Sequence, residues 1–246
     1  MIVLFTDFGP SGPYVGQMKA VLHREAPGVP VVDLFCDAPA FDPQAAAYLL
    51  AAYAPEFPAG TVFLAVVDPG VGGPRAPLVV AADGRWYVGP DNGLFAIVAR
   101  RAAQARAWEI TWRPARLSAS FHGRDVFAPV AARLARGEAP PGRERSEAET
   151  QRAPGADWPQ DLARVVYIDH FGNAMTGLRA AGLASGAILE VAGRRLARAR
   201  SFCDLPPGAP FWYENANGLA EIAVNRGHAA RALGLAVGAE VRVHAR

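Results

Sequence analysis

The sequence is short of lysine, of cysteine and of net charge. It contains a single lysine, Lys19, among 25 basic residues, and its formal net charge is +2. A charge this close to zero gives no reason to expect nucleic acid or an anionic membrane as a partner. The arginine bias is typical of a GC-rich genome. The two cysteines, Cys36 and Cys203, are far apart and lack CxxC or histidine spacing, which predicts no disulfide framework and fits a reducing cytoplasm.

Several common signatures are also missing. The start, MIVLFTDFG, has no basic region and no long apolar run, so we expect no signal peptide, no membrane-spanning helix and a cytoplasmic protein. No GK[ST], GxSxG or HExxH occurs, which gives little support to a phosphate loop, a serine hydrolase or a zinc protease. With 246 residues, 51% of them hydrophobic and 20% charged, the chain is typical of a globular protein with one large domain or two smaller ones.

The first half of the chain alternates apolar runs with helical patterns, which predicts an α/β sheet with parallel strand pairs. The predicted strands are IVLF, VPVVDLF, GTVFLAVVD, PLVVAA, WYVG and AWEITW. The predicted helices are YVGQMKAVLHREA, DPQAAAYLLAAYA, GLFAIVARRA and GRDVFAPVAARLARG. In such a sheet ligand sites lie at the carboxyl ends of the strands, and Asp7 and Asp68 both come just after such ends.

The second half has a different pattern. Residues 138–160 are polar and rich in proline, which predicts a linker or a long surface loop. Short strands separated by turns follow, with one helical stretch, HAARALG, and this pattern fits a small antiparallel barrel or sandwich. We therefore place an N-terminal α/β domain at residues 1–155 and a C-terminal β domain at residues 160–246.

Four polar residues of the first half are candidates for chemistry. Asp7 can hold a ribose diol or cap the following turn. Asp68 and Arg75 flank a loop rich in Pro and Gly, VVDPGVGGPR, and can form a functional pair or a salt bridge that only staples the turn. His122 precedes a predicted helix and can act as an acid, a base or a hydrogen-bond anchor. A metal site made of Asp7, Asp68, Asp91 and His122 has no supporting spacing.

Two stretches of the second half offer ligand contacts. In DHFGNAMTG, Phe171 can stack on a base while Asn173 bonds its edge, because an amide has both a donor and an acceptor; a simple turn is the alternative. In FWYENANG, three aromatic residues precede a polar turn, and such a cluster is more often core than pocket wall.

Seven motifs in one order resemble a known family. They are TDFG (6–9), YVGQMK (14–19), VDPGVGG followed by Arg75, GPDNGL (89–94), FHGRDVFAP (121–129), IDHFGNAMT (168–176) and ENANG (214–218). Together they resemble the S-adenosyl-L-methionine (SAM) hydroxide adenosyltransferases, also called SAM hydrolases, which share a superfamily with the SAM-dependent fluorinase and chlorinase. The similarity covers nearly the whole chain.

The resemblance implies a larger N-terminal α/β sandwich-like (Rossmann-type) domain and a small C-terminal antiparallel β-barrel. It also implies a homotrimer that binds SAM between subunits. Because the sulfonium of SAM is already a good leaving group, we expect the hydrolase to need no cofactor and no metal. The catalytic set of the hydrolase branch maps onto Asp68, Arg75 and His122. The halogenase branch has a tyrosine near the position of Asp68 and a serine where this chain has Gly123. Both differences favour the hydrolase over a halogenase. The intact set of Asp68, Arg75 and His122 argues against a non-catalytic SAM sensor.

The resemblance also assigns ligand contacts. Asp7 is expected to hold the ribose hydroxyls, Phe171 and Asn173 the adenine, and Asp169 the methionine amino group. The expected substrate contacts further include Tyr213, Glu214, Asn215 and Ala216.

This sequence departs from the family pattern at three positions. Gly12 and Ala216 stand where aspartate and serine are common, so we expect the methionine end to be held differently. Gly177 stands where asparagine is usual, which is a smaller deviation.

Overall fold

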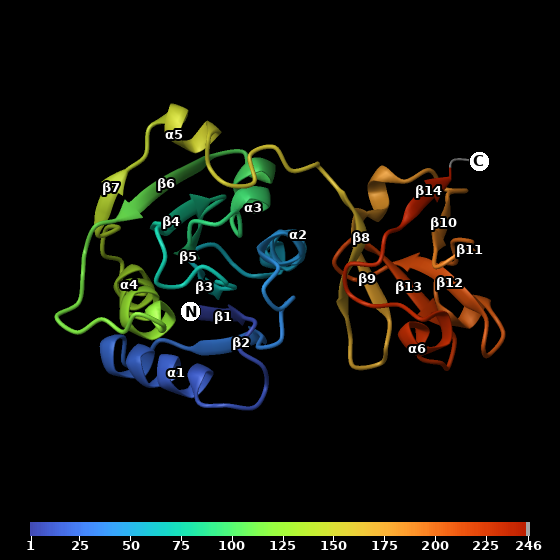
Figure 1. Ribbon diagram of the computed structural model, residues 1–246, viewed down its shortest axis with the longest axis horizontal. Coiled ribbons are helices and arrows are strands. Elements are labelled where there is room, and N and C mark those ends of the chain that lie inside the picture. The colour runs from blue at the N-terminus through green and yellow to red at the C-terminus, as the bar shows by residue number, and fades with distance from the viewer. Residues whose placement is uncertain (245–246) are drawn as a thin grey trace. The chain divides into compact units, whose positions relative to one another are not determined.

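The computed structural model describes residues 1–244 and divides the chain into two compact units, Met1–Trp158 and Pro159–Arg246 (Figure 1). Each unit has its own hydrophobic core. Within residues 1–244, no helix is both long enough and apolar enough to cross a membrane.

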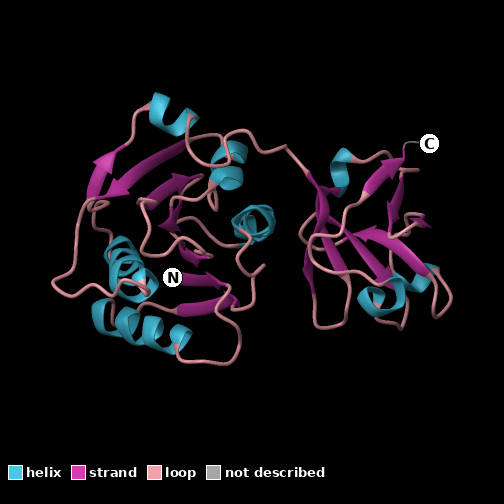
Figure 2. Ribbon diagram, viewed as in Figure 1, coloured by secondary structure: helices cyan, strands magenta, loops and turns pink. Residues whose placement is uncertain are grey.

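A seven-stranded mixed sheet forms the centre of the first unit (Figures 1 and 2). Its strands, in the order in which they pair, are β2 (Val31–Phe35), β1 (Ile2–Thr6), β3 (Val62–Val66), β5 (Arg85–Pro90), β4 (Pro77–Ala82), β6 (Ala105–Ile110) and β7 (Gly142–Glu144). The first four pair in parallel and the last three are antiparallel. β1 and β3 are buried along their whole length, as expected for central parallel strands made of β-branched and aromatic residues.

Helices pack against this sheet. They are α1 (Tyr14–Glu25), α2 (Pro43–Tyr53), α3 (Ala96–Arg101) and α4 (Ala128–Ala135), with the short turns η1 (Ala54–Glu56) and η2 (Gly123–Phe127). Met18 and Leu22 of α1 share one core cluster with Val130 of α4 and Leu64 of β3. α2 begins at Asp42, whose side chain accepts a hydrogen bond from Ala45 N at 2.9 Å, and its alanines and leucines are buried. The predicted α/β class is confirmed.

The prediction of a linker or a long surface loop over residues 138–160 is wrong for two stretches within the segment. The segment adds β7 to the sheet edge and forms α5 (Glu147–Gln151), which starts with a capping box between Ser146 and Glu149. Its end is tied down by Arg100, which donates hydrogen bonds to the carbonyl oxygens of Gly155 and Trp158, both at 2.6 Å. These bonds attach the segment to the first unit. They join residues that are distant in sequence, so local hydrophobic patterning does not reveal them.

The second unit is a closed barrel of short antiparallel strands. They are β8 (Leu162–Ile168), β9 (Ala174–Arg179), β10 (Ile188–Val191), β11 (Arg194–Leu196), β12 (Pro210–Glu214), β13 (Leu219–Val224) and β14 (Arg242–His244). One sheet has the order β12-β13-β9-β8 and the other β11-β10-β14. Bridges between Arg164 and Glu240, and between Arg198 and Trp212, join the two sheets at both edges, which confirms the predicted barrel.

Three further elements belong to the second unit. The helix α6 (Ala229–Leu233) and the 3₁₀ turns η3 (Ala180–Gly182) and η4 (Phe202–Asp204) lie in its connections. β9 falls within the stretch where the sequence suggested a turn.

Candidate active site

Two aspartates of the first unit are brought to the same sheet edge by parallel pairing. β1 and β3 are neighbours, with Thr6 opposite Val66, so the residues that follow them emerge together. The Asp7 amide N–H donates to Val66 O at 3.4 Å, and Asp68 lies two residues beyond Val66. The strand-end argument therefore places both carboxylates correctly at one edge.

The loop from Asp68 to Arg75 is tightly folded. Val71 N donates to Asp68 O at 3.2 Å, and Gly73 N donates to Gly70 O at 3.0 Å. Gly72 has φ +78°, and a Cβ there would lie 2.4 Å from the carbonyl oxygen of Ala119, so this position requires glycine. The close approach fixes the loop against the segment that leads to His122.

Asp68, Arg75 and His122 converge. Arg75 Nε donates to Asp68 Oδ1 at 3.0 Å and to Oδ2 at 3.1 Å, and Arg75 Nη2 also donates to Oδ2. Arg75 Nη2 lies 2.9 Å from His122 Nδ1. The side chains of Arg75 and Asp68 are 10% and 5% exposed, and the Arg75 guanidinium lies over the ring of Phe127 at 5.3 Å. The salt bridge between Asp68 and Arg75 that the sequence left open is present, and Arg75 also contacts His122.

These contacts decide the protonation of His122. A guanidinium only donates hydrogen bonds, so Nδ1 must accept from Arg75, and in the neutral ring the proton is on Nε2. Burial, followed by the positive charge of Arg75, lowers the pKa of His122 below its usual value. The ring is therefore neutral and offers an Nε2–H donor. In residues 1–244, the hydrogen bonds of Arg75 use Nε and Nη2, which leaves the two Nη1 hydrogens to donate to a further group.

Asp7 is half-buried and has one oxygen engaged. Its Oδ2 accepts a hydrogen bond from the amide of Phe41 at 3.1 Å. Burial raises its pKa, and the nearby charge of Asp68 adds to that effect. Phe41 has φ +59° and its side chain is 77% exposed. Sequence reasoning did not identify this aromatic residue beside Asp7, because only the fold brings the two together.

Arg124 and Asp125, which follow His122 closely in the sequence, pair with each other. Their side chains form an ion pair at 2.6 Å, and Asp125 accepts a hydrogen bond from Ser118 N at 2.7 Å. In residues 1–244, no three His, Cys, Asp or Glu side chains are grouped so as to hold a metal ion. Cys36 and Cys203 are free thiols.

A hollow of the second unit collects four of the predicted contact residues. Its volume is about 740 Å³, and it is lined by Asp169, Phe171, Asn173, Phe202, Tyr213, Val224, Arg226, Gly227 and His228. Phe171 is 74% exposed and free to stack on a ligand. Sequence reasoning missed Phe202, Arg226 and His228, because they come from turns that only the barrel gathers around this hollow.

The other predicted contacts of this unit point elsewhere. Glu214 accepts a hydrogen bond from Arg198 at 2.8 Å and lines a different hollow, because consecutive strand residues face opposite sides. Asn215 is 8% exposed, and its amide oxygen accepts from the backbone N–H groups of Asn217 and Leu219, each at 3.0 Å. Ala216 is exposed in the turn that follows β12. Tyr213 therefore lines the same hollow as Asp169 and Asn173, whereas Glu214 does not.

Glu221 is a buried carboxylate that sequence reasoning missed. It lies on β13, opposite Tyr213 in the strand register, and is 2% exposed. The Tyr213 hydroxyl donates to Oε1 at 2.6 Å, and Asn215 Nδ2 donates to Oε2 at 2.9 Å. Burial raises the pKa of Glu221, and hydrogen bonds from Tyr213, Asn215 and Asn173 oppose that shift. The available signal was an acidic residue inside the apolar strand LAEIAV.

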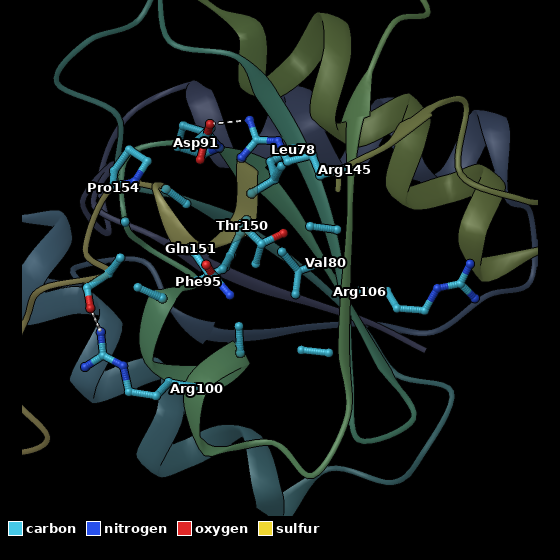
Figure 3. Close-up of a pocket in the computed structure, with 18 residues that line it drawn as sticks. Leu78, Val80, Asp91, Phe95, Arg100, Arg106, Arg145, Thr150, Gln151 and Pro154 are labelled. Atoms are coloured by element: carbon cyan, nitrogen blue, oxygen red, sulfur yellow. Dashed lines mark hydrogen bonds and ion pairs between the residues drawn. The ribbon is translucent and has the colours of Figure 1, made fainter. Parts of the chain in front are cut away.

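A separate cavity in the first unit contains none of the predicted site residues. Its volume is about 340 Å³, and it lies between the sheet, α3 and the segment that carries α5 (Figure 3). Its wall is mostly apolar, with Leu78, Val80 and Phe95 among the lining residues. Asp91, one of the residues considered for a metal site, lies there in an ion pair with Arg145. The Asp91 carboxylate therefore pairs with the Arg145 guanidinium.

Comparisons with known proteins agree with this geometry. The chain matches the SAM hydroxide adenosyltransferase N-terminal domain over residues 2–143 and the corresponding C-terminal domain over residues 163–242. It is 45% identical over 257 residues to the (R)-S-adenosyl-L-methionine hydrolase of Thermus thermophilus, covering 98% of both chains. It is 41% identical over 258 residues to the hydrolase of the same name from Salinispora arenicola, covering 98% of this chain and 96% of the other.

More distant relatives and solved structures extend the match. A fluorinase from Actinopolyspora mzabensis is 28% identical over 288 residues, covering 99% of this chain and 96% of the fluorinase. The crystal structure of an uncharacterized conserved protein from Thermotoga maritima superposes with a TM-score of 0.87 at 30% identity, covering 100% of both chains.

Proposed function

The chain belongs to the SAM hydroxide adenosyltransferase family, and we propose that it hydrolyses SAM to adenosine and L-methionine. Relatives named as SAM hydrolases match over nearly the full length, whereas the fluorinase is more distant. The observation that carries the proposal is the convergence of Asp68, Arg75 and His122. A protein that only binds SAM does not need a carboxylate, a guanidinium and a neutral imidazole that are hydrogen-bonded to one another.

The reaction needs little from the enzyme at the leaving group. The sulfonium of SAM departs as the neutral thioether of methionine when the C5′–S electron pair moves to sulfur. The remaining requirement is a water oxygen in line with that bond and a group that takes a proton from the water as the C5′–O bond forms. We assign no metal and no cofactor to this step.

The roles we propose follow from the donors and acceptors of the three side chains. Asp68 is the proton acceptor, because it is the only anion of the three. The Nε2–H of neutral His122 donates to a lone pair of the water and orients it. The Nη1 hydrogens of Arg75 stabilise the negative charge that develops on the attacking oxygen.

The remaining side chains would hold the substrate. We assign the ribose hydroxyls to Asp7, the adenine to Phe171 and Asn173, and the methionine amino group to Asp169. The hollow that contains the last three, together with Tyr213, supports this assignment.

We propose a cytoplasmic homotrimer in which the first unit of one subunit and the second unit of its neighbour complete each site. The resemblance to the family supports this arrangement. Light scattering after gel filtration should give three times the 26.0 kDa mass of the chain, and a monomeric active enzyme would refute the arrangement.

Product analysis tests the proposed function against its alternatives. Incubation with SAM should yield adenosine and methionine in equal amounts, with or without chloride or fluoride and with or without EDTA. A 5′-halo-adenosine product would make the protein a halogenase. Tight binding of SAM or adenosine with no turnover over hours would make it a sensor.

A further inference from the structure

The cavity of the first unit is built from elements that are far apart in the sequence. Strand β4 contributes Leu78 and Val80, the residue before α3 is Phe95, and α3 itself contributes Ala96 and Ala99. Strand β6 and the segment that carries α5 form much of the remaining wall (Figure 3). The volume of about 340 Å³ is at the lower end of the range for small-molecule pockets, roughly 300–1,000 Å³. The cavity therefore suits a ligand of one or two rings.

A guanidinium with unused donors lies at one end of this cavity (Figure 3). Arg145 donates to Asp91 Oδ2 through Nη2, and its side chain is 9% exposed. Within residues 1–244 this is the one hydrogen bond that the guanidinium makes, so most of its five N–H groups have no protein acceptor. Over the same residues Asp91 uses only Oδ2, which leaves Oδ1 as an acceptor. The pair therefore offers a ligand both donors and an acceptor.

The other charged side chains of the wall are engaged elsewhere. Arg100 donates to a backbone carbonyl oxygen at 2.6 Å, and Arg106 donates to Glu144 at 2.6 Å. An N–H group that is shielded from water and has no acceptor costs free energy, so a ligand atom that accepts from Arg145 supplies a missing bond. The polar end of the cavity is therefore Arg145 with Asp91, and the rest of the wall favours apolar contact.

The charges of the pair narrow the choice of ligand. Arg145 and Asp91 neutralise each other, so a charged ligand would enter a mostly apolar cavity without a counter-ion of its own. A carboxylate would also bring its second oxygen against Asp91 Oδ1, and an amidinium would bring its N–H groups against those of Arg145. A primary amide avoids both conflicts, because its oxygen accepts from Arg145 and its nitrogen donates to Asp91.

We propose that this cavity binds a small uncharged molecule in which an amide is attached to an apolar ring. The amide bonds Arg145 and Asp91, and the ring packs against Val80 and Phe95. None of the candidate catalytic residues lines the cavity, so the site is additional to the one described above and does not rest on the proposed function.

Titration of the wild-type protein with benzamide, benzoate and benzamidine, followed by saturation-transfer NMR, tests the proposal. The three probes share one shape and differ in charge. We expect benzamide to bind with a Kd on the order of 1 mM, as for other ligands of its size, and about 10- to 100-fold more tightly than either charged probe. Excess adenosine should not displace it. Undetectable binding of benzamide, equal or tighter binding of a charged probe, or displacement by adenosine would overturn the proposal.

The variant Ala99→Leu tests whether the probe lies in this cavity. Leucine suits a helix and adds its side chain to the cavity from α3, so benzamide affinity should fall about 10-fold or more. Ala148→Leu is the matched control, because Ala148 is an exposed residue of α5 that does not line the cavity; its affinity should equal that of the wild type. Wild-type affinity in a folded Ala99→Leu protein would place the probe elsewhere and refute the proposal.

The variant Asp91→Asn tests the charge argument. It keeps the shape of the side chain and an oxygen that accepts from Arg145, but it leaves the cavity with a positive charge. The preference should then reverse from benzamide to benzoate. Circular dichroism checks that the variant is folded. A folded Asp91→Asn protein that keeps the wild-type preference for benzamide would show that the pair does not select the ligand.

Discussion

Arg75 is the residue that links the other two members of the candidate catalytic set. It donates to both oxygens of Asp68 and to His122 Nδ1, so its planar fork sets the position of the carboxylate and the tautomer of the imidazole together. Lysine has the same charge but cannot make these bonds in one plane. The role of Arg75 therefore depends on the geometry of its guanidinium as well as on its charge.

We expect Arg75→Lys to lower kcat for SAM hydrolysis on the order of 10²–10³-fold, the usual cost of losing one preorganised electrostatic partner. Adenosine formation followed by chromatography measures this. Arg106→Lys is the control, because Arg106 forms an exposed pair with Glu144 and its side chain is 64% exposed. If the two variants had equal rates, Arg75 would not take part in the reaction.

The pH dependence of the rate should report His122. Burial and Arg75 lower its pKa, so the ring stays neutral at pH values where an ordinary histidine is half protonated. kcat/KM should remain level as the pH falls through about 6.5, the ordinary value, and decrease only at lower pH. Stability follows the same sign, because the unfolded chain binds the proton more readily and folding is weakened as the pH falls below that value. A decrease that begins at pH 7 or above would be evidence against a neutral His122.

The loop between β3 and β4 is the element that carries two members of the candidate catalytic set, Asp68 and Arg75. Its start is held by Asn92, whose Nδ2 donates to Val67 O at 2.8 Å, and its middle is held by the close approach of Gly72 to Ala119. Asn92 belongs to the GPDNGL motif, and this bond gives that motif a structural purpose. The loop is thus fixed from two sides by residues that are distant in sequence.

Gly72→Ala should destabilise the protein through this element. The new Cβ would lie 2.4 Å from Ala119 O, in addition to the cost of φ +78°, so we expect a loss of about 2–4 kcal/mol in the free energy of unfolding. Gly28→Ala is the control, since Gly28 has φ +81° with nothing within 4 Å of its Cβ, and it should lose about 1–2 kcal/mol. Denaturant unfolding measures both, and equal losses would show that the contact with Ala119 is not important.

Sequence patterns predicted the elements that have local signals. The buried strands β1 and β3 and the amphipathic α1 follow from periodicity alone, and the strand-end rule placed Asp7 and Asp68 at one edge. β9 was missed because its first residues resemble a turn, and β7 and α5 because their polar residues give no periodicity.

The relations between side chains could not be predicted. Glu221 meets Tyr213 only when β13 and β12 pair, and no local pattern encodes that pairing. The contact of Arg75 with His122 joins residues 47 positions apart for the same reason.

At the scale of the whole molecule, the first unit extends to Trp158 and includes the polar segment after α4. Arg100 holds the end of that segment, and Arg145 within it pairs with the partly buried Asp91. These contacts are charge-assisted and largely shielded from water, so they are stronger than surface pairs.

A chain that ends at residue 158 should therefore fold and unfold cooperatively, whereas a chain that ends at residue 137 should be less stable by several kcal/mol because it also loses β7. Thermal unfolding followed by circular dichroism compares the two. Equal midpoints would mean that the segment is only a linker.

Hydrolysis of SAM in ¹⁸O-labelled water, with mass analysis of both products, tests most directly whether water attacks C5′. Water attack at C5′ predicts one ¹⁸O atom in the 5′-hydroxyl of adenosine and none in methionine. Adenosine without the label, or a label in methionine, would contradict the account, because the new bond would then not be formed between water and C5′.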